Sequence, residues 1–190
     1  KTTTTYLLKA ILEQARGVKV GLIGTNQNMI GSDVIPTERT TPESFEVQKL
    51  FREMADAGCT HVVMETSSHA LYLDRVYGVR YDVGIFTNLT QDHLDFHKTM
   101  ENYCDAKAIL FRNCVTGVVN ADDPWTPRLL KNADCKVMTY AEQADADLRA
   151  ENIVLSAGGI ASDAVSGAER VPIRVNIPGG FMVYNTLDVL

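Results

Sequence analysis

Short apolar segments alternate with stretches of helical periodicity along most of the chain. Strands are predicted where apolar and β-branched residues follow one another, at 18–25, 60–66, 80–88, 115–122 and 135–141. Helices are predicted where apolar residues recur every three or four positions, at 4–15, 43–57 and 100–113. Such alternation indicates βαβ units, in which helices cover both faces of a mainly parallel sheet. The predicted fold class is therefore α/β.

The pattern changes in two parts of the chain. Residues 26–42 hold Gly, Asn, Ser, Asp and two prolines, which favours a loop. Near the C-terminus, 151–157 and 170–178 have the composition of strands, joined by a Gly/Ser/Ala-rich loop at 157–168 with no helix between them. This predicts a short antiparallel edge. The final segment, 178–190, reads as a Pro-Gly-Gly turn followed by the apolar start of a helix.

Composition and charge narrow the class of partner. The chain has 190 residues, enough for one sizeable core, and a net charge of −6 with acidic and basic residues interspersed. This argues against nucleic acid or an anionic membrane surface as the main partner. No apolar run approaches the roughly 18 residues of a membrane span, so no membrane insertion is expected. The four cysteines are scattered, as expected for reduced thiols in a cytoplasmic protein.

The chain opens with KTTTT directly before the first predicted helix. A phosphate-binding loop ends in a lysine that reaches the outer phosphates and a Ser or Thr whose hydroxyl ligates Mg²⁺. Lys1 and Thr2 fit these last two positions, although threonines are also common in exposed tails. The glycines that would precede the lysine are absent, so the phosphate cradle is incomplete.

Polar side chains follow the predicted strands, at the edge where open α/β sheets bind ligands. Glu65 ends one strand directly after three apolar residues, and Asn120 ends another. Asn88 ends a third, and the segment DHLDFH at 92–97 lies just past it. Lys1, before a helix, belongs to the same edge. We therefore expect these groups to converge.

Each of these residues also has an ordinary structural role open to it. An isolated glutamate such as Glu65 is often a surface carboxylate or a helix cap, and Asn120 could equally help to cap the helix that follows. A lysine on a helix, such as Lys107, is most often simply solvated. The density of two carboxylates and two imidazoles in DHLDFH is unusual for a plain loop.

Seven segments in order along the whole chain resemble the central, ATP-binding domain of the Mur ligases. Within that family they resemble the ligases that add the third residue of the peptidoglycan stem. The segments are KTTTT (1–5), RTTPES (39–44), METSSHAL (64–71) with DRV (74–76), FTNLTQDHLDFH (86–97), ENYCDAKAILF (101–111), VVNADDP (118–124) and GGFMVYNTL (179–187). Met182 departs from the family, which usually has asparagine there.

The resemblance implies a fold and a domain organisation. The fold is a P-loop NTPase-like, mainly parallel sheet flanked by helices, with the short antiparallel edge near the C-terminus. Residues 1–178 correspond to the central ATP-binding domain, truncated at the N-terminus within its phosphate loop. Residues 179–190 correspond to the start of the connection to a missing C-terminal domain. We therefore expect a fragment that is inactive alone.

For ATP, the resemblance implies a nucleotide site of five residues. Lys1 would contact the β- and γ-phosphates, and Thr2 the Mg²⁺ that bridges them. Thr3 completes this phosphate end of the site. Asn88 and Asn120 resemble nucleotide-pocket residues, with Asn120 reading the adenine.

For catalysis, the resemblance adds three residues to Lys1. Glu65 and His93 resemble the protein ligands of a second Mg²⁺. Lys107 matches a lysine that family members carry as a carbamate, an anion that can help to hold a cation where an ammonium would repel it.

Four further residues resemble the contacts to the muramoyl-dipeptide substrate: Thr40, Thr41, Ser67 and Arg75. The implied reaction starts with attack of the free D-glutamate carboxylate of UDP-MurNAc-L-Ala-D-Glu on the γ-phosphorus of ATP. The amine of a diamino acid then displaces phosphate from the acyl phosphate. Two Mg²⁺ ions and a lysine would offset the repulsion between carboxylate and phosphate.

Two other functions stay open on the sequence. One is another ATP-dependent amide ligase of the same superfamily, a different Mur ligase or a folylpolyglutamate synthetase, which shares the lysine-threonine opening. The other is a non-catalytic nucleotide-binding module, which would have no need of Glu65, His93 and Lys107 together. The identity of the diamino acid, meso-diaminopimelate, L-lysine or another, is also open.

Overall fold

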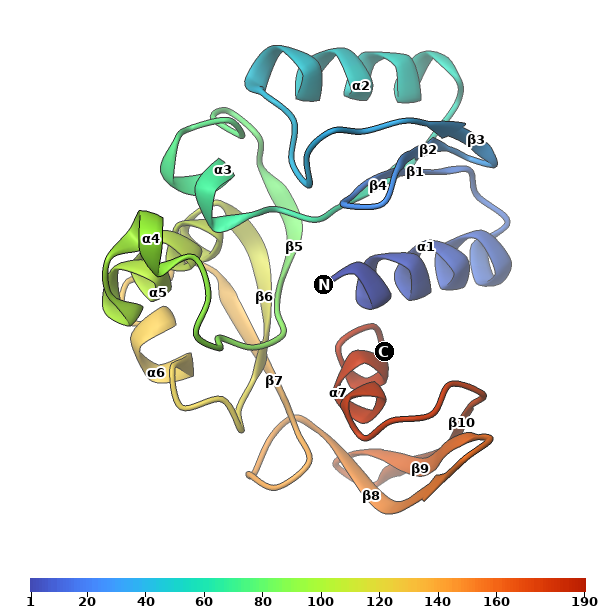
Figure 1. Cartoon of the computed structure of the whole chain (residues 1–190). Helices are drawn as coiled ribbons and strands as arrows, with labels where there is room; N and C mark the ends of the chain where they lie inside the picture. The colour runs from blue at the N-terminus through green and yellow to red at the C-terminus, as the bar shows by residue number, and fades with distance from the viewer. The chain divides into compact units, whose positions relative to one another are not determined.

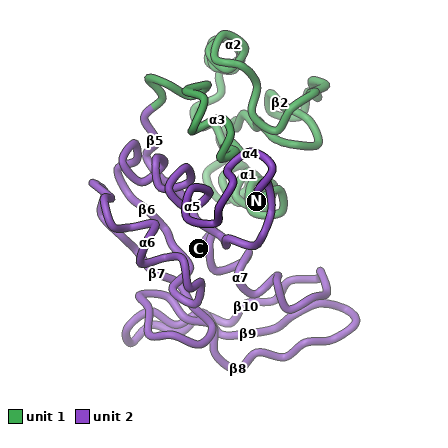
Figure 2. Tube along the Cα trace, turned by 60° about the vertical axis from the view of Figure 1, so that its left-hand side comes forward, with its two compact units in different colours: residues 1–79 green, residues 80–190 purple.

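Two separate sheets carry the strands of this chain in the computed structural model, which describes residues 1–190. Each sheet belongs to its own unit of structure, unit 1 at Lys1–Val79 and unit 2 at Arg80–Leu190 (Figure 2). The α/β class is confirmed, with parallel strand pairs in both sheets and antiparallel strands at the C-terminal end.

Unit 1 has a four-stranded sheet in the order β3-β2-β1-β4 (Figure 1). Its strands are β1 (Val20–Ile23), β2 (Asn28–Ile30), β3 (Asp33–Ile35) and β4 (His61–Met64). Its helices are α1 (Thr2–Arg16), α2 (Ser44–Asp56) and α3 (Ser68–Tyr72). β1 and β4 run parallel, whereas the other two pairs are antiparallel.

Strand β1 is buried at every position because both of its faces are covered. Val20 and Leu22 pack with apolar residues of α1, and Ile23 packs with Leu50 and Met54 of α2. Successive strand residues point to opposite faces, so a continuous apolar run indicates a strand covered on both sides.

The prediction of a loop at 26–42 is wrong for its first half, where β2 and β3 form a hairpin. Gly31, with φ of 61°, begins the turn between the strands. Each strand has only three residues, too few to give a visible alternation in the sequence. The tight turn needs the left-handed backbone that glycine adopts without strain, so Gly31 marks a hairpin turn.

Unit 2 has a six-stranded sheet in the order β10-β9-β8-β7-β6-β5 (Figure 1). Its strands are β5 (Tyr81–Phe86), β6 (Cys114–Asn120), β7 (Lys136–Ala141), β8 (Leu148–Ser156), β9 (Gly159–Ser166) and β10 (Glu169–Val175). The pairs β5–β6, β6–β7 and β7–β8 are parallel, whereas the pairs β8–β9 and β9–β10 are antiparallel. The predicted antiparallel edge is therefore confirmed.

The prediction of a loop at 157–168 is wrong, because β9 occupies most of it. Its small residues resemble a flexible connection in sequence, but the strand pairs along both sides, with β8 and with β10. Ile160, Ala164 and Val165 of β9 are buried. Backbone pairing on two sides and these few apolar contacts outweigh the low strand propensity of Gly, Ser and Ala, since tertiary context overrides propensity in sheets.

The helices of unit 2 are α4 (Leu94–His97), α5 (Met100–Ala108), the 3₁₀ helix η1 (Ile109–Arg112), α6 (Thr126–Leu129) and α7 (Phe181–Leu187). Phe86, Phe111, Val119 and Leu129 form the centre of one apolar core. The buried Tyr140 hydroxyl donates a hydrogen bond of 3.0 Å to the Phe86 carbonyl. These contacts hold the ends of β5, β6 and β7 in register.

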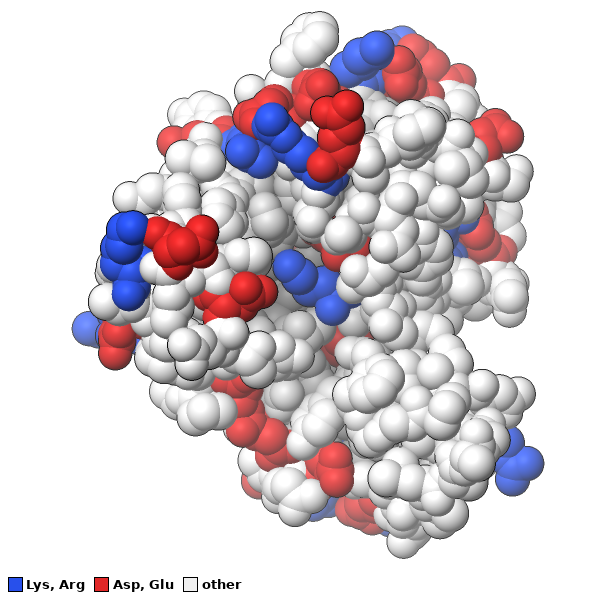
Figure 3. Space-filling model, in the orientation of Figure 1, with Lys and Arg blue, Asp and Glu red and all other residues white.

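Charged side chains are mixed in sign on the face drawn in Figure 3, where basic groups lie beside acidic ones. Over α2, two ion pairs of this kind join Lys49 to Glu53 at 3.7 Å and Arg52 to Asp56. None of the helices combines the length and the apolar character that crossing a lipid bilayer requires.

Candidate functional site

The carboxylate of Glu65 is the centre of a hydrogen-bond network in unit 1. Glu65 follows β4 and is only 2% exposed. Its Oε1 accepts a hydrogen bond of 3.0 Å from the Thr25 backbone N–H, and its Oε2 accepts hydroxyls from Thr25 and Thr2, both at 3.0 Å. A buried carboxylate needs such donors to offset its lost hydration. A carboxylate has about four lone-pair positions, so this arrangement leaves room for a further ligand.

Parallel pairing of β1 with β4 explains why these groups meet. Ile23 is the partner of Met64, so the residues that follow both strands, Thr25 and Glu65, emerge at the same edge. Gly24 makes the close approach possible, because a Cβ at this position would lie 2.8 Å from Glu65 Oε1. We call Gly24, Thr25 and the Glu65 carboxylate the Glu65 seat.

The loop before α2 is tied to the same point. The buried Thr41 hydroxyl donates 2.7 Å to the Glu65 carbonyl and accepts 3.0 Å from the Ser67 backbone N–H. The Ser67 hydroxyl in turn caps α3 by accepting from the Ala70 N–H. The Thr40 hydroxyl lies 3.0 Å from the Thr25 hydroxyl. Two of the expected substrate residues, Thr41 and Ser67, therefore also help to position Glu65 and the loop that follows it.

Arg75 reaches this loop from the segment after α3. Its guanidinium lies 3.1 Å from the Glu43 carboxylate and 3.4 Å from the Thr41 carbonyl. The Nε atom of Arg75 is buried without a hydrogen-bond partner. Arg39 pairs with the same Glu43 carboxylate. Glu43 thus holds two guanidinium groups beside the expected substrate loop.

Helix α1 begins next to the Glu65 carboxylate. Lys1 is its N-cap residue and makes no side-chain capping hydrogen bond, and no acidic residue lies in the first turn. The first N–H groups of a helix and its dipole favour an anion at such a position. Thr2 is joined to Glu65, whereas Thr3 lies in the same turn outside that network.

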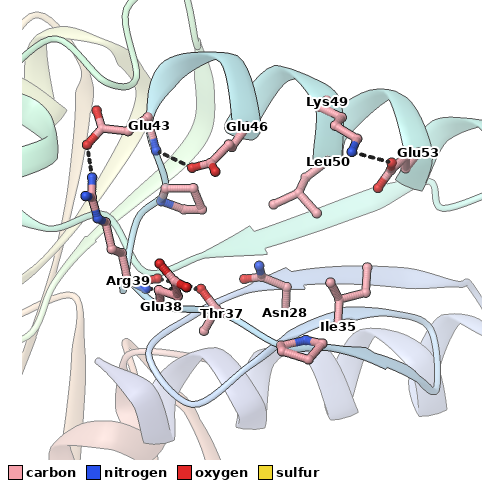
Figure 4. A pocket seen from close by; sticks show the side chains of 12 residues that line it. Asn28, Ile35, Thr37, Glu38, Arg39, Glu43, Glu46, Lys49, Leu50 and Glu53 are labelled. Carbon is pink, nitrogen blue, oxygen red and sulfur yellow. Dashed lines mark hydrogen bonds and ion pairs between the residues drawn. The ribbon is translucent and has the colours of Figure 1, made fainter.

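A cavity of about 410 Å³ lies between α2 and the segment from β3 to Pro42 (Figure 4). Its two basic side chains are already matched, Arg39 with Glu43 and Lys49 with Glu53. Glu38 and Glu46 add further negative charge to its lining. This excess of carboxylates disfavours a phosphate group and argues against the cavity as a nucleotide site.

In unit 2, Asn120 at the end of β6 forms hydrogen bonds with the loop that follows β5 and with the loop that follows β6. Its amide donates 3.0 Å to the Thr87 carbonyl and accepts 3.0 Å from the Asp122 N–H. Asn120 is buried, whereas Asn88 beside Thr87 is exposed. The structure therefore gives Asn120 a positioning role and leaves the Asn88 side chain at the surface of the same loop.

Asp122 and Tyr184 connect β6 to the C-terminal helix. The Asp122 carboxylate accepts the backbone N–H groups of residues 142–144 and the Tyr184 hydroxyl, the last at 3.0 Å. Burial raises the pKa of Asp122, but the three N–H donors and Tyr184 outweigh it and leave the pKa below its ordinary value. Burial is the main cause that raises the pKa of Tyr184, and the hydrogen bond to the Asp122 carboxylate adds to that rise. α7 is thereby held against β7, β8 and β9.

Two expected catalytic residues, His93 and Lys107, lie against the ring of Tyr103 in α5. His93 meets it edge-on at 5.9 Å between centroids, and the Lys107 ammonium lies 4.9 Å from its centroid. The buried His97 stacks on the same ring at 5.0 Å. Burial raises the pKa of Tyr103, and Asp92 adds to that rise. His93 has φ of 53°, a left-handed conformation, at the start of α4.

The residues of unit 1 suit a magnesium ion that also has nucleotide ligands. The three hydrogen bonds leave one lone-pair position of the Glu65 carboxylate free, on Oε1, and the Thr2 oxygen lies 3.0 Å from Oε2 of the same carboxylate. No group of three or more His, Cys, Asp or Glu side chains is arranged to hold a metal ion. Magnesium commonly takes only one or two carboxylates and completes its shell with water and phosphate.

Sequence reasoning missed three residues of these networks: Thr25, Glu43 and Tyr103. Thr25 was within reach, because it follows its strand as Glu65 follows the neighbouring strand. Glu43 and Tyr103 lie within the segments RTTPES and ENYCDAKAILF, but a helix N-cap and a buried helix tyrosine are both common, so neither residue carried a signal of its own.

An α/β domain with a buried carboxylate at a strand end, beside the N-terminus of a helix, is typical of proteins that bind phosphorylated ligands. The family model described as the Mur ligase middle domain matches residues 1–190. The chain belongs to this family.

Relatives and solved structures agree with this assignment. The UDP-N-acetylmuramoyl-L-alanyl-D-glutamate–2,6-diaminopimelate ligase of Clostridium botulinum is 52% identical over 187 residues, which cover 98% of this chain and 38% of the relative. A solved structure of a ligase with the same name is 28% identical, with a TM-score of 0.91, over 100% of this chain and 40% of its own. MurF from Acinetobacter baumannii has a TM-score of 0.76 over 99% of this chain and 39% of its own, but at 19% identity it shows the fold alone.

Proposed function

We propose that the protein containing this chain is an ATP-dependent ligase of the third-residue (MurE) type. It would join 2,6-diaminopimelate to UDP-MurNAc-L-Ala-D-Glu during peptidoglycan synthesis in the cytoplasm. The observation that carries the proposal is the 52% identity, across 98% of this chain, to a ligase of that name. Because the chain spans 38% of that relative, the complete reaction is proposed for the full-length protein.

In unit 1, the residues would bind and orient the phosphates and the attacking carboxylate. Lys1 and the N–H groups that begin α1 would receive the phosphates of ATP, with Thr3 in the same turn. Thr2 and Glu65 would hold Mg²⁺, since the Thr2 hydroxyl is joined to the Glu65 carboxylate and one lone-pair position of that carboxylate stays free. Mg²⁺ would supply neutralisation of charge on the phosphate oxygens.

The dipeptide would lie along the loop that contains Thr40 and Thr41, with Ser67 and Arg75 beside it. Arg75 carries its charge on a planar fork that matches a carboxylate, and Glu43 keeps that fork in place. Positioning of the D-glutamate carboxylate at the γ-phosphorus would account for much of the rate, because phosphoryl transfer needs little covalent chemistry from the protein.

In unit 2, we assign Asn88 and Asn120 to the nucleotide, and His93 and Lys107 to the second Mg²⁺. The resemblance paired Glu65 with His93 on that ion, whereas the contact of Glu65 with Thr2 leads us to assign Glu65 to the first ion. Asn120 would act largely by holding the loop of Asn88 through the Thr87 carbonyl. Lys107, as a carbamate, would serve that cation together with His93, and both side chains adjoin the ring of Tyr103.

The test uses the full-length protein with ATP, Mg²⁺, UDP-MurNAc-L-Ala-D-Glu and one amino acid at a time. Mass spectrometry should detect the UDP-MurNAc-tripeptide with meso-diaminopimelate, at a kcat/KM at least tenfold above that with L-lysine. The variant Lys107→Ala should abolish product and serves as the control for contaminating ligase. Product with L-lysine alone would reassign the acceptor.

The same assay separates the two other candidate functions. Product with a D-alanyl-D-alanine or glutamate acceptor, on a tripeptide or folate substrate, would favour a different ligase of the superfamily. ATP binding without any product from these substrates would favour a non-catalytic nucleotide-binding module.

A further inference from the structure

We infer that Thr25 is a positioning residue, one that sets the orientation of the Glu65 carboxylate for a divalent cation. The inference rests on the proposed function, because it takes Glu65 as a cation ligand. Thr25 lies outside every motif that the sequence singled out, yet it supplies two of the three hydrogen bonds that the Glu65 carboxylate accepts.

The geometry of these bonds fixes the plane of the carboxylate. The Thr25 backbone N–H reaches Oε1 and the Thr25 hydroxyl reaches Oε2, both at 3.0 Å. Two donors from one residue to the two oxygens hold the carboxylate against rotation about its last bond, and the Thr2 hydroxyl adds a second donor to Oε2 from another element. Gly24 closes the third side, since only hydrogen fits between its Cα and Oε1.

The Thr25 hydroxyl links the hydrogen bonds of Glu65 to Thr40 in the expected substrate loop. The Thr25 hydroxyl has one proton, and it is donated to Glu65 Oε2. The contact of 3.0 Å with Thr40 therefore uses the Thr40 proton, with the Thr25 oxygen accepting. Thr25 thus joins a residue expected to touch the dipeptide to one expected to touch the cation.

Residues that orient a metal ligand affect metal affinity by about 10–100-fold when they are substituted. Thr25→Val has nearly the shape of threonine and keeps the backbone N–H bond, but it removes the hydroxyl. We expect Thr25→Val to weaken cation binding about tenfold, and Thr25→Ser, which retains the hydroxyl, to bind within about threefold of the unsubstituted protein.

Binding is measured on the full-length protein with Mn²⁺ as the probe, by loss of the free Mn²⁺ electron paramagnetic resonance signal. Saturating ADP is present, and ADP without protein is the blank. Thr60→Val is the matched control, because Thr60 lies before β4, at the other end of the strand from Glu65, and its hydroxyl contacts only the neighbouring His61 ring. This control should bind Mn²⁺ as the unsubstituted protein does.

A role limited to folding predicts a different result. It would lower the thermal midpoint of Thr25→Val and leave the Mn²⁺ affinity of the folded protein unchanged. The positioning role predicts a raised Mg²⁺ concentration for half-maximal rate, with the KM for ATP at saturating Mg²⁺ within twofold. Thr25→Ala provides the same comparison where the valine variant does not fold.

The outcomes distinguish this inference from the proposed function. Mn²⁺ affinity of Thr25→Val and Thr25→Ala within twofold of the unsubstituted protein, in a protein that binds Mn²⁺, would overturn the role of Thr25 alone. Absence of protein-dependent Mn²⁺ binding in the unsubstituted protein would overturn the proposed cation site, and this inference with it. A tenfold loss with serine rescue supports both.

Discussion

Replacement of Gly24 by alanine tests how closely the Glu65 carboxylate lies against the backbone. The new Cβ would lie 2.8 Å from Glu65 Oε1, whereas ordinary contacts begin at 3.4 Å, so the carboxylate must move by about 0.6 Å. Gly24 is not among the residues with positive φ, so its backbone accepts alanine. The strain therefore comes from the contact alone.

A shift of this size along the Thr25 N–H bond would stretch it from 3.0 Å to about 3.6 Å, beyond hydrogen-bond range. Loss of a hydrogen bond to a charged group costs about 1.5–3 kcal/mol. We therefore expect Gly24→Ala to lower the stability of this edge of the sheet by about 2 kcal/mol and to weaken Mn²⁺ binding about tenfold.

Hydrogen exchange of the full-length protein, followed by mass spectrometry of peptides that span β1 and β4, measures the effect. A loss of about 2 kcal/mol corresponds to roughly 30-fold faster exchange at Thr25, since each 1.4 kcal/mol is a factor of ten. Gly158→Ala is the control, because the nearest atom to its new Cβ is 3.8 Å away. Unchanged exchange in the Thr25 peptide of Gly24→Ala would refute the close packing of Glu65 on this backbone.

Three further substitutions test contacts away from the Glu65 seat. Asp122→Asn should lower the stability of unit 2 by about 1–3 kcal/mol at pH 7, because its backbone donors lose a charged acceptor. Since the folded-state pKa of Asp122 is lowered, its contribution is complete above the ordinary aspartate pKa and is lost as pH falls through the folded value. The difference between the two proteins in urea unfolding should therefore shrink as pH falls from 7 to 3, and a constant difference would contradict the assignment. Glu43→Gln removes the charge that holds Arg75, so the KM for UDP-MurNAc-L-Ala-D-Glu should rise severalfold with kcat less affected, as steady-state kinetics will show. Gly117→Ala would place a Cβ 2.7 Å from the Phe111 ring in the unit 2 core, and a fall of about 1–3 kcal/mol in unfolding free energy is expected from urea titration.

The parts of the fold that were predictable carry long or uniform signals. The helix at 43–57 repeats its apolar residues over nearly four turns, and β1 is apolar on both faces because helices cover both. The hairpin β2–β3 and strand β9 were missed for a shared reason. Their residues are few or small, and they form strands only because a partner strand already offers its backbone.

Candidate residues of the site were predictable where a strand end locates them. Glu65 and Asn120 both lie at the ends of parallel strands, as expected. Their hydrogen-bond partners were harder to find, because Thr2 is 63 positions from Glu65 and Thr25 is 40 positions away. Such contacts depend on which strands become neighbours, and local periodicity carries no information about that. The two-sheet arrangement was beyond reach for the same reason.

The left-handed backbone of His93 sets the stability of the fold against retention of the imidazole side chain. A side chain in this conformation costs about 1 kcal/mol relative to glycine, so His93→Gly would relieve strain while deleting the imidazole. Selection for heat resistance alone should therefore enrich glycine or asparagine at this position, and selection for ligase turnover should retain histidine. A library of variants at position 93, selected separately for heat resistance and for ligase turnover, would show whether the preferred residue differs between the two selections. Under the proposed cation role of His93, selection for turnover would maintain this strain, which Asp74, Lys98 and Asn152 share without such a role.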